Sequence, residues 1–159
     1  MSACALDETA VKKIHKLKDR SSHKPFIVLI SQIAQLEHLG INLAEAKKFK
    51  KYWPASLSII FEAINSPNWL QLGSNSLAVR WPNHPALTSL IDKTGPIIST
   101  SANKEGGQPI NSSIVAKRQF GDELDFYLDV GDLANHQPST IVKLEKGELV
   151  VIRQGELKL

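Results

Sequence analysis

The stretch PIISTSANKEGGQP, Pro96–Pro109, begins like a buried strand and changes abruptly into a polar loop. Ile97 and Ile98 form the apolar start, and small hydroxyl side chains and a carboxamide follow at its carboxyl end. Open α/β sheets bind ligands at this end of a strand. Gly106 and Gly107 let the backbone approach a ligand and present successive N–H groups to an anion. On this pattern alone, the simpler interpretation is a polar turn after a strand.

The flanking sequence predicts an α/β domain, because helical and strand patterns alternate along the chain. Strand patterns cover residues 26–30, 56–62, 76–81, 96–100, 126–130, 140–144 and 149–153. A first helical pattern begins after Asp7. Four others run from Ser31 to Gly40, from Asn42 to Pro54, from His84-Pro85 to Gly95, and from Ser112 or Ser113 to Phe120. Residues 65–68 are predicted to form a loop. The last two strands form a hairpin with its turn at 146–147, so we expect a mixed sheet.

Length and charge favour one domain with two basic clusters. A chain of 159 residues can bury a sizeable core in a single domain. Its formal net charge of +3 is unevenly spread, because basic side chains gather at residues 12–24 and 47–51. Such clusters usually form solvated helix faces, and they also suit a polyanion such as a nucleotide or RNA.

Cysteine usage and hydropathy predict a cytoplasmic protein. Cys4 is the single cysteine, which excludes an internal disulfide and a zinc cluster built on cysteines, and fits a reducing compartment. No apolar run approaches the ~20 residues that a membrane helix needs. The start also lacks the basic and then apolar pattern of a signal peptide.

Several polar residues are candidates for binding anions. Arg80 interrupts an apolar strand, where its guanidinium can hold a carboxylate through two parallel hydrogen bonds or can face solvent. Arg20 and Lys24 lie at a helix–strand junction, either as surface charges or as a pair of cations for phosphates. Ser139 begins one strand of the hairpin and Arg153 ends the next, so the two can meet at one edge.

Known nucleotide and metal motifs do not match the chain. It has no Walker-type loop, no Gly-x-Gly-x-x-Gly and no Gly-x-Ser-x-Gly, so any nucleotide site is of an unusual kind. The histidines lack metal-ligand spacing, and we interpret them as structural or exposed: they are His15, His23, His38, His84 and His136.

Taken together, five segments in the same order resemble the YrdC-like family, the threonylcarbamoyl-AMP synthases, over nearly the whole chain. The segments are Lys18–Pro25 (Lys-x-Arg…Pro in the family), Trp53–Ser58 (Trp-Pro-Gly-Pro-Leu-Thr), Val79–Pro85 (Val-Arg-x-Pro-x-His-Pro), Ser101–Asn103 (Ser-Ala-Asn), and Ser139–Val142 with Ile152–Gly155 (Ser-Thr-Val and Ile-Arg-x-Gly). Each segment alone is a weak signal, and the five in order are a strong one.

This resemblance implies a fold and a reaction. The fold is a YrdC-like twisted open mixed sheet flanked by helices, a single domain over residues 1–159. The reaction joins L-threonine, bicarbonate or CO2, and ATP into L-threonylcarbamoyl-AMP and pyrophosphate, for threonylcarbamoyladenosine modification of tRNA. No covalent enzyme nucleophile is needed. A Mg²⁺ ion bridging phosphate oxygens is expected, and the partners are tRNA and the tRNA threonylcarbamoyl-transferase proteins.

The resemblance also implies roles for individual residues. Threonine would be held by Arg80, Ser101 and Ser139, with Arg80 at its carboxylate. ATP would be held by Arg20, Lys24, Ser76, Asn103, Asn111 and Arg153, with the cations at its phosphates.

The chain departs from the family pattern at three places. Ala55 and Ser56 replace the Gly and Pro of the Trp-Pro segment, and Glu105 replaces a serine beside the expected phosphates. A carboxylate there is unfavourable unless it points away or meets Mg²⁺. The family's opening Thr-x-Thr-x-Tyr-Gly-Leu motif has no counterpart, because residues 1–4 align just after it. We therefore expect an N-terminally incomplete domain that lacks an initial strand and one wall of the threonine pocket.

Two alternatives to the synthase stay open. One is a non-catalytic YrdC-like module that binds RNA on a basic concave face, which the lysine clusters and Glu105 favour. The other is a related carbamoyl-adenylating domain that uses carbamoyl phosphate. Such domains normally sit in much larger chains with zinc-binding and acylphosphatase-like parts, which this sequence does not contain.

Overall fold

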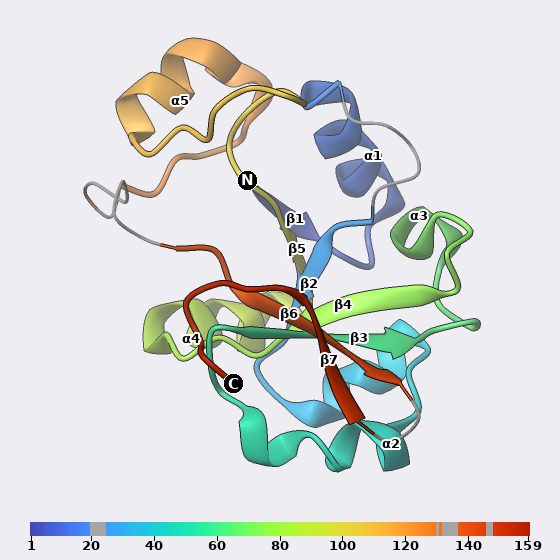
Figure 1. Ribbon diagram of the computed structural model, residues 1–159. Coiled ribbons are helices and arrows are strands. Elements are labelled where there is room, and N and C mark those ends of the chain that lie inside the picture. Colours follow the sequence, from blue (N-terminus) through green and yellow to red (C-terminus); the bar gives the residue numbers. More distant parts are fainter. Residues whose placement is uncertain (20–24, 130, 132–136, 146–147) are drawn as a thin grey trace.

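The computed structural model describes residues 1–19, 25–129, 131, 137–145 and 148–159. In this part of the chain one mixed seven-stranded sheet has the order β1-β5-β2-β4-β3-β6-β7 (Figure 1). The strands are β1 (Ser2–Cys4), β2 (Ile27–Leu29), β3 (Leu57–Glu62), β4 (Ser76–Arg80), β5 (Ile97–Ser99), β6 (Thr140–Glu145) and β7 (Glu148–Arg153). β2 runs parallel to β4 and β3 parallel to β6, whereas the other neighbours are antiparallel. The predicted α/β class with a mixed sheet is confirmed.

Three helices begin at predicted residues whose side chains cap them: Asp7, Asn42 and His84. The helices are α1 (Glu8–Leu17), α2 (Leu43–Lys47), α3 (Asn68–Gln71), α4 (Pro85–Thr94) and α5 (Ser113–Phe120), with 3-10 segments η1 (Ile33–Leu39), η2 (Lys50–Tyr52) and η3 (Gly121–Glu123). The side chains of Asp7, Asn42 and His84 each accept a backbone N–H of the following first turn, at 3.1, 2.8 and 3.2 Å. Such caps satisfy amide groups that have no partner inside the helix.

Ser31 does not cap a helix, so that prediction is wrong. Its backbone N–H and its hydroxyl both donate to the side-chain oxygen of Gln35, at 2.8 and 3.3 Å. The segment that follows is the 3-10 helix η1, which begins after Gln32. Its end at Gly40 is confirmed, and the residue has a left-handed φ of 69°. A Cβ atom there would lie 2.6 Å from the backbone of Asn65, so only glycine fits.

The prediction of one helix over residues 43–53 is also wrong, because the segment is broken into α2 and η2. The Phe49 ring packs edge-on against Phe61, with the ring centroids 5.5 Å apart. The Trp53 indole N–H donates to the backbone oxygen of Leu57 at 2.8 Å. Both side chains are buried, so tertiary packing overrides the helical pattern here.

Three other segments differ from their predicted structure. Residues 126–129 form no strand, and the exposed fractions of Phe126 and Leu128 are 68% and 69%. An alternating sequence pattern forms a strand only where another strand lies beside it to pair with. The predicted loop at 65–68 ends in α3, whose Trp69 donates its indole N–H to Ala5 at 3.1 Å. β1 is an unpredicted strand that pairs with β5, and the hairpin turn at 146–147 and Val130 lie outside the described residues.

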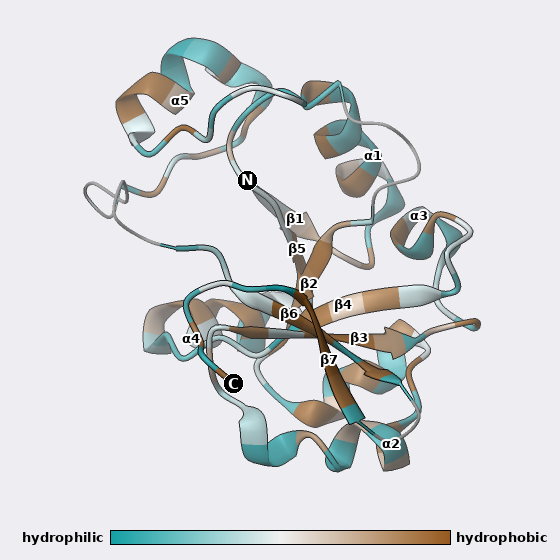
Figure 2. Ribbon diagram, in the orientation of Figure 1, coloured by the Kyte–Doolittle hydropathy of each residue, from teal (hydrophilic) through white to brown (hydrophobic). Residues whose placement is uncertain are grey.

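The strand register assigns side chains to the two faces of the sheet. One face carries the main core residues Val28, Ile59, Leu77, Val79 and Val142, and α1, η1 and α2 cover it. Figure 2 shows hydrophobic colour along the central strands and both hydrophobic and hydrophilic colour on the helices. The opposite face carries Ser58, Ser76, Ala78, Arg80 and Ser99, and we call it the serine-rich face.

Helix α4 covers only part of the serine-rich face. Its Ile91 packs on Leu29 of β2 and Ile97 of β5 in a small second core. Small hydroxyl side chains and Arg80 occupy the neighbouring positions toward β4 and β3. Since such residues do not build an apolar core, this region of the sheet is the candidate binding region.

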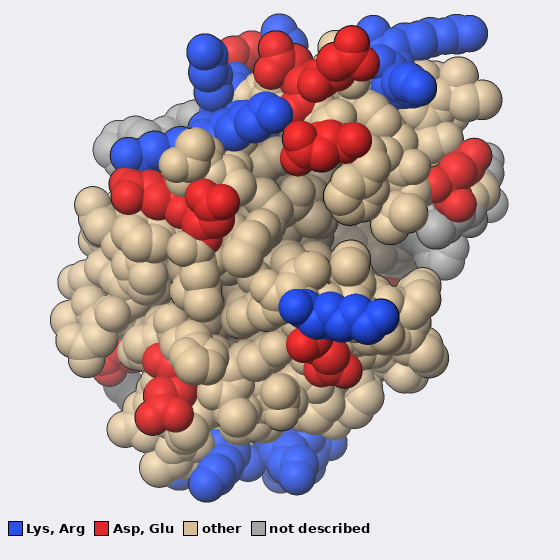
Figure 3. Space-filling view, turned by 180° about the vertical axis from the view of Figure 1, so that it is seen from behind, with Lys and Arg blue, Asp and Glu red and all other residues tan. Residues whose placement is uncertain are grey.

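The two lysine clusters lie on the helices that cover the core face of the sheet. Lys12, Lys13 and Lys16 belong to α1, whereas the second cluster at 47–51 belongs to α2 and η2. Figure 3 shows basic patches at opposite ends of the molecule, with acidic side chains mixed among the upper ones. Lys12 pairs with Glu8 at 2.7 Å. Along the described residues, the clusters therefore resemble solvated helix faces and not one basic concave surface. None of the described helices has the length and apolar character to cross a membrane.

Candidate active site

Arg80 is the central charged residue of the serine-rich face. It ends β4 and is half-buried, and its Nη2 donates to the hydroxyl of Ser56 at 3.0 Å. Its Nε is buried and has no hydrogen-bond partner among the described residues. Burial lowers the pKa of Arg80, and the nearby carboxylate of Glu156 opposes this effect. A buried guanidinium with an N–H to spare is suited to bind an anionic group such as a carboxylate.

Arg153 and Ser139 meet at one edge, as the hairpin pattern predicts. Nε and Nη2 of Arg153 donate to the backbone oxygen of Ser139 at 3.2 and 2.7 Å, and Nη2 lies 3.3 Å from its hydroxyl. The Ser139 hydroxyl also contacts that of Ser58 at 2.9 Å. Burial lowers the pKa of Arg153. Because Ser58 is the register partner of Arg80, we call Arg80, Ser56, Ser58, Ser139 and Arg153 the arginine end of the site.

Gly155 makes the arginine end possible through its lack of a side chain. A Cβ atom at this position would lie 2.1 Å from the backbone oxygen of Pro138 and 2.6 Å from the carbonyl carbon of Ser139. The Gly155 N–H donates to the hydroxyl of Thr140 at 3.0 Å, and that hydroxyl donates to Leu157 at 2.6 Å. The Ile-Arg-x-Gly ending therefore holds the chain after β7 against the start of β6.

The Ser-Ala-Asn loop is fastened to the end of α1 by Lys18. This side chain is almost fully buried, with an exposed fraction of 2%. Its Nζ donates to the backbone oxygens of Ser101 and Asn103, both at 2.6 Å. In the reverse direction, the Glu105 N–H donates to the backbone oxygen of Lys18 at 2.7 Å. The loop is thus tied to α1 at both of its ends.

The carboxamide of Asn103 shapes this loop from inside. Its oxygen accepts a hydrogen bond from the Ser101 hydroxyl and lies 3.4 Å from Lys18 Nζ. Its nitrogen donates to the backbone oxygens of Lys104 and Gly107, at 2.7 and 2.9 Å. Because the side chain is used within the loop, Asn103 would serve a ligand mainly by holding the loop backbone in place.

The two halves of the predicted threonine set lie at different places on the serine-rich face. Arg80 and Ser139 belong to the arginine end, whereas Ser101 follows β5. From the register, the Cα atoms of Arg80 and Ser99 are separated by two strand spacings and two residues. This separation is roughly 12 Å. The Arg80 side chain and a bound threonine are together long enough to cover this distance.

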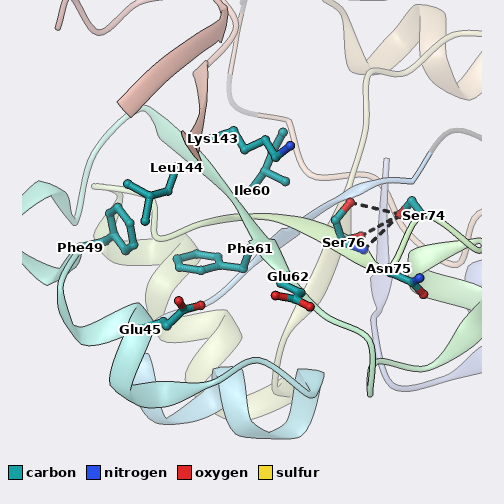
Figure 4. Close-up of a pocket in the computed structure, with 10 residues that line it drawn as sticks. All are labelled: Glu45, Phe49, Ile60, Phe61, Glu62, Ser74, Asn75, Ser76, Lys143 and Leu144. Carbon is teal, nitrogen blue, oxygen red and sulfur yellow. Dashed lines mark hydrogen bonds between the residues drawn. The ribbon is translucent and has the colours of Figure 1, made fainter. Parts of the chain in front are cut away.

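The remaining predicted ATP residues do not all gather at one point. Ser76 is on the same face as Arg80 but at the opposite end of β4, where it lines a pocket of about 390 Å³ with Glu62 and Lys143 (Figure 4). Figure 4 shows the Ser76 side chain hydrogen-bonded to Ser74. Asn111 lines a separate groove of about 640 Å³ beside β1 and α4. Arg20 and Lys24 lie outside the described residues.

Sequence analysis missed three residues of the site: Lys18, Ser56 and Glu156. A signal for Lys18 was available, because with Val11 and Ile14 it occupies the helical spacing of the apolar face of α1. A charged residue on that face must find buried partners. For Glu156 no local pattern exists, because its partner Ser56 is 100 residues away in the sequence.

The donor set of the site suits anions and not a protein-bound metal ion. The groups described above are guanidinium, ammonium, hydroxyl, carboxamide and backbone N–H, with the single carboxylate of Glu156. Along the described ranges, no group of three or more His, Cys, Asp or Glu side chains could hold a metal ion. A Mg²⁺ ion would therefore depend on oxygens of a bound phosphate chain and on water.

Comparisons with known proteins show the family to which the chain belongs. The family model for Sua5, YciO and YrdC proteins, described as telomere recombination, matches residues 1–155. The chain is 31% identical over 144 residues to a threonylcarbamoyl-AMP synthase from Marinobacter nauticus, covering 87% of this chain and 76% of that protein. It is also 31% identical to a threonylcarbamoyl-AMP synthase from Pyrococcus abyssi, covering 100% of this chain and 48% of that one. The structure of P. abyssi Sua5 complexed with L-threonine matches with a TM-score of 0.81 and 31% identity, over 97% of this chain and 46% of that one. The chain thus spans about half the length of the P. abyssi protein.

Proposed function

The chain belongs to the Sua5, YciO and YrdC family, and we propose that it makes L-threonylcarbamoyl-AMP and pyrophosphate from L-threonine, bicarbonate or CO2, and ATP. The observation that carries the proposal is Arg80, a half-buried guanidinium with an unpaired Nε on the serine-rich face. This site occurs in a chain similar to a Sua5 protein whose structure contains L-threonine.

Arg80 would bind the carboxylate of L-threonine. Its buried Nε–H has no partner among the described residues, and a carboxylate accepts two parallel hydrogen bonds from one guanidinium. Ser139 lies in the same arginine end and would contribute to the amino-acid pocket. Ser101, beyond the end of β5, would contact the other part of the extended product, near the carbamate.

The reaction needs no covalent bond to the protein. The neutral amine of threonine attacks CO2, and the nitrogen loses a proton to give a carbamate. A carbamate oxygen then attacks the α-phosphorus of ATP in line, and the bond to pyrophosphate breaks. The site contributes position, positive charge and exclusion of water, because a free carbamate decomposes to amine and CO2.

The ATP phosphates would lie between the Ser-Ala-Asn loop and the cations of the site. Asn103 holds the loop in shape, so backbone N–H groups of this loop can face an anion. We propose that Arg20, Lys24, Ser76, Asn111 and Arg153 complete the ATP site, as the family pattern implies. Mg²⁺, when bound to the phosphates, would neutralise part of their charge.

The proposed product is consumed by tRNA modification. A mixed anhydride between a carbamate and a phosphate is an activated acyl donor, and its acceptor here would be the adenosine next to the anticodon. We infer that tRNA and the tRNA threonylcarbamoyl-transferase proteins are partners. The cytoplasmic location remains a prediction.

Pyrophosphate release tests this function directly. Folded protein is incubated with ATP, Mg²⁺ and bicarbonate, with and without L-threonine, and with D-threonine as the matched control. We expect pyrophosphate release that depends on L-threonine and on bicarbonate. Folded protein that releases no pyrophosphate but binds RNA in a salt-dependent manner would instead support the RNA-binding module.

A further inference from the structure

Arg80, Ser56 and Glu156 form a hydrogen-bonded series that joins three separate parts of the fold. Nη2 of Arg80 donates to the Ser56 hydroxyl at 3.0 Å, and the Ser56 hydroxyl donates to Oε2 of Glu156 at 2.6 Å. Arg80 ends β4, Ser56 precedes β3, and Glu156 lies in the tail after β7. Figure 1 shows this tail turning back beside the chain that enters β3. We call the two residues that hold Arg80 the Ser56–Glu156 bridge.

The donor and acceptor groups of the bridge fix the direction of its hydrogen bonds. An ionised carboxylate only accepts hydrogen bonds, and a serine hydroxyl has one proton to donate. Because Glu156 takes this proton, the lone pairs of the Ser56 oxygen are left to face the guanidinium of Arg80. Without Glu156, the hydroxyl could rotate and give its proton to water, and its contact with Arg80 would weaken.

The bridge occupies Nη2 of the Arg80 guanidinium and leaves the buried Nε without a partner among the described residues. The carboxylate of Glu156 is close enough to stabilise the charged guanidinium against its burial. Arg80 is therefore charged, partly buried and held from one side.

The resemblance to the family does not itself imply this arrangement. Ser56 stands where the family's Trp-Pro-Gly-Pro-Leu-Thr pattern has proline, and proline has no hydroxyl to offer. Glu156 follows the Ile-Arg-x-Gly segment, which is the last of the five segments that match the family pattern. The family pattern thus specifies the arginine but neither member of the bridge.

We propose that Ser56 and Glu156 are positioning residues that hold the Arg80 guanidinium in the orientation that binds the L-threonine carboxylate. The inference rests on the proposed function for the identity of the ligand. Neither residue touches the reacting amine, carbon dioxide or phosphorus. Their removal therefore affects the KM for L-threonine, and it leaves the KM for ATP and kcat nearly unchanged.

Four variants and one control test the bridge by steady-state pyrophosphate release. Ser56→Ala and Glu156→Ala each raise the KM for L-threonine about tenfold or more, the effect of losing one hydrogen bond to a charged group. The double variant raises KM no more than either single variant, because both act through one contact. Ser56→Thr keeps a hydroxyl, so its KM for L-threonine stays at the wild-type value. Glu148→Ala, which removes another carboxylate at the far end of β7, is the matched control.

Two results would overturn the proposal. Additive effects in the double variant would mean that Ser56 and Glu156 act independently. Glu156→Gln keeps an acceptor for the hydroxyl, so we expect a KM within about twofold of wild type. A clear fall in the KM of this variant would show that Glu156 acts by repelling the substrate carboxylate.

A second measurement needs no substrate and separates this proposal from the proposed function. The ¹⁵N relaxation of the Arg80 Nε–H reports how well the guanidinium is ordered. We expect lower order in Ser56→Ala and Glu156→Ala and unchanged order in Glu148→Ala. Unchanged order in all variants would refute the bridge even in an active enzyme. Lower order in a protein that neither binds nor uses L-threonine would support the bridge and refute the proposed ligand.

Discussion

The side-chain nitrogen of Lys18 lies 2.6 Å from the backbone oxygen of Ser101, although 83 residues separate them in the sequence. The same nitrogen donates to Asn103, so one buried ammonium holds two backbone oxygens of the loop after β5. A buried charge is tolerated only with such partners, because its loss of hydration must be replaced by hydrogen bonds. Lys18 therefore couples the stability of α1 to the shape of the active-site loop.

Replacing Lys18 with methionine is expected to lower the free energy of unfolding by about 2 kcal/mol, because buried oxygens lose a donor. Urea denaturation measures this change. We also expect a higher KM for ATP, since the loop is released. Lys16→Met, at an exposed position of the same helix, is the control and should change stability by less than about 0.5 kcal/mol. A Lys18→Met variant as stable as this control would contradict the role of the contact.

Replacing Arg80 with lysine keeps the charge but removes the fork of parallel N–H groups. The KM for L-threonine should rise about tenfold or more, while the KM for ATP stays nearly constant. Both constants come from pyrophosphate release at saturating levels of the other substrate. Arg118→Lys, at an exposed position of α5, is the matched control. An unchanged KM for L-threonine would remove Arg80 from the threonine site.

Alanine at Gly155 should destabilise the protein by about 1–3 kcal/mol, the range for an overpacked site. The added Cβ would lie 2.1 Å from the oxygen of Pro138, and a backbone atom cannot yield as a flexible side chain can. Gly107→Ala is the milder comparison, because its nearest contact would be 3.3 Å. Thermal and urea unfolding of the two variants should differ clearly. Equal stability would mean that the tail after β7 can move away at little cost.

Valine at Thr140 removes the hydroxyl that connects β6 to the tail. This hydroxyl accepts from Gly155 and donates to Leu157, and the residue is fully buried. We expect amide hydrogen exchange to become at least tenfold faster at Gly155 and Glu156, because the segment opens locally more often. Thr88→Val, whose hydroxyl bonds within the α4 region, is the control and should leave these two amides unchanged. Slow exchange in Thr140→Val would show that other contacts hold the tail.

Much of the fold was predictable from local patterns. The helix starts at Asp7, Asn42 and His84 follow from side chains that satisfy amides a few residues away. The strands of the sheet follow from apolar and alternating runs, with β1 as the exception. The errors have one cause: the break between α2 and η2, and the missing strand at 126–129, depend on partners outside the segment itself.

For the candidate site, the sequence by itself determined which residue types are present, their order along the chain and their likeness to a family of threonylcarbamoyl-AMP synthases. Only the tertiary structure decided which of them touch. It joined Arg153 to Ser139, tied Lys18 to the loop at Ser101, and brought Glu156 to Ser56 across 100 residues. The physical reason is that a local pattern records interactions between neighbours in the chain. The partner of a guanidinium or a hydroxyl is set instead by the order and register of the strands, which bring distant residues to the same edge of the sheet.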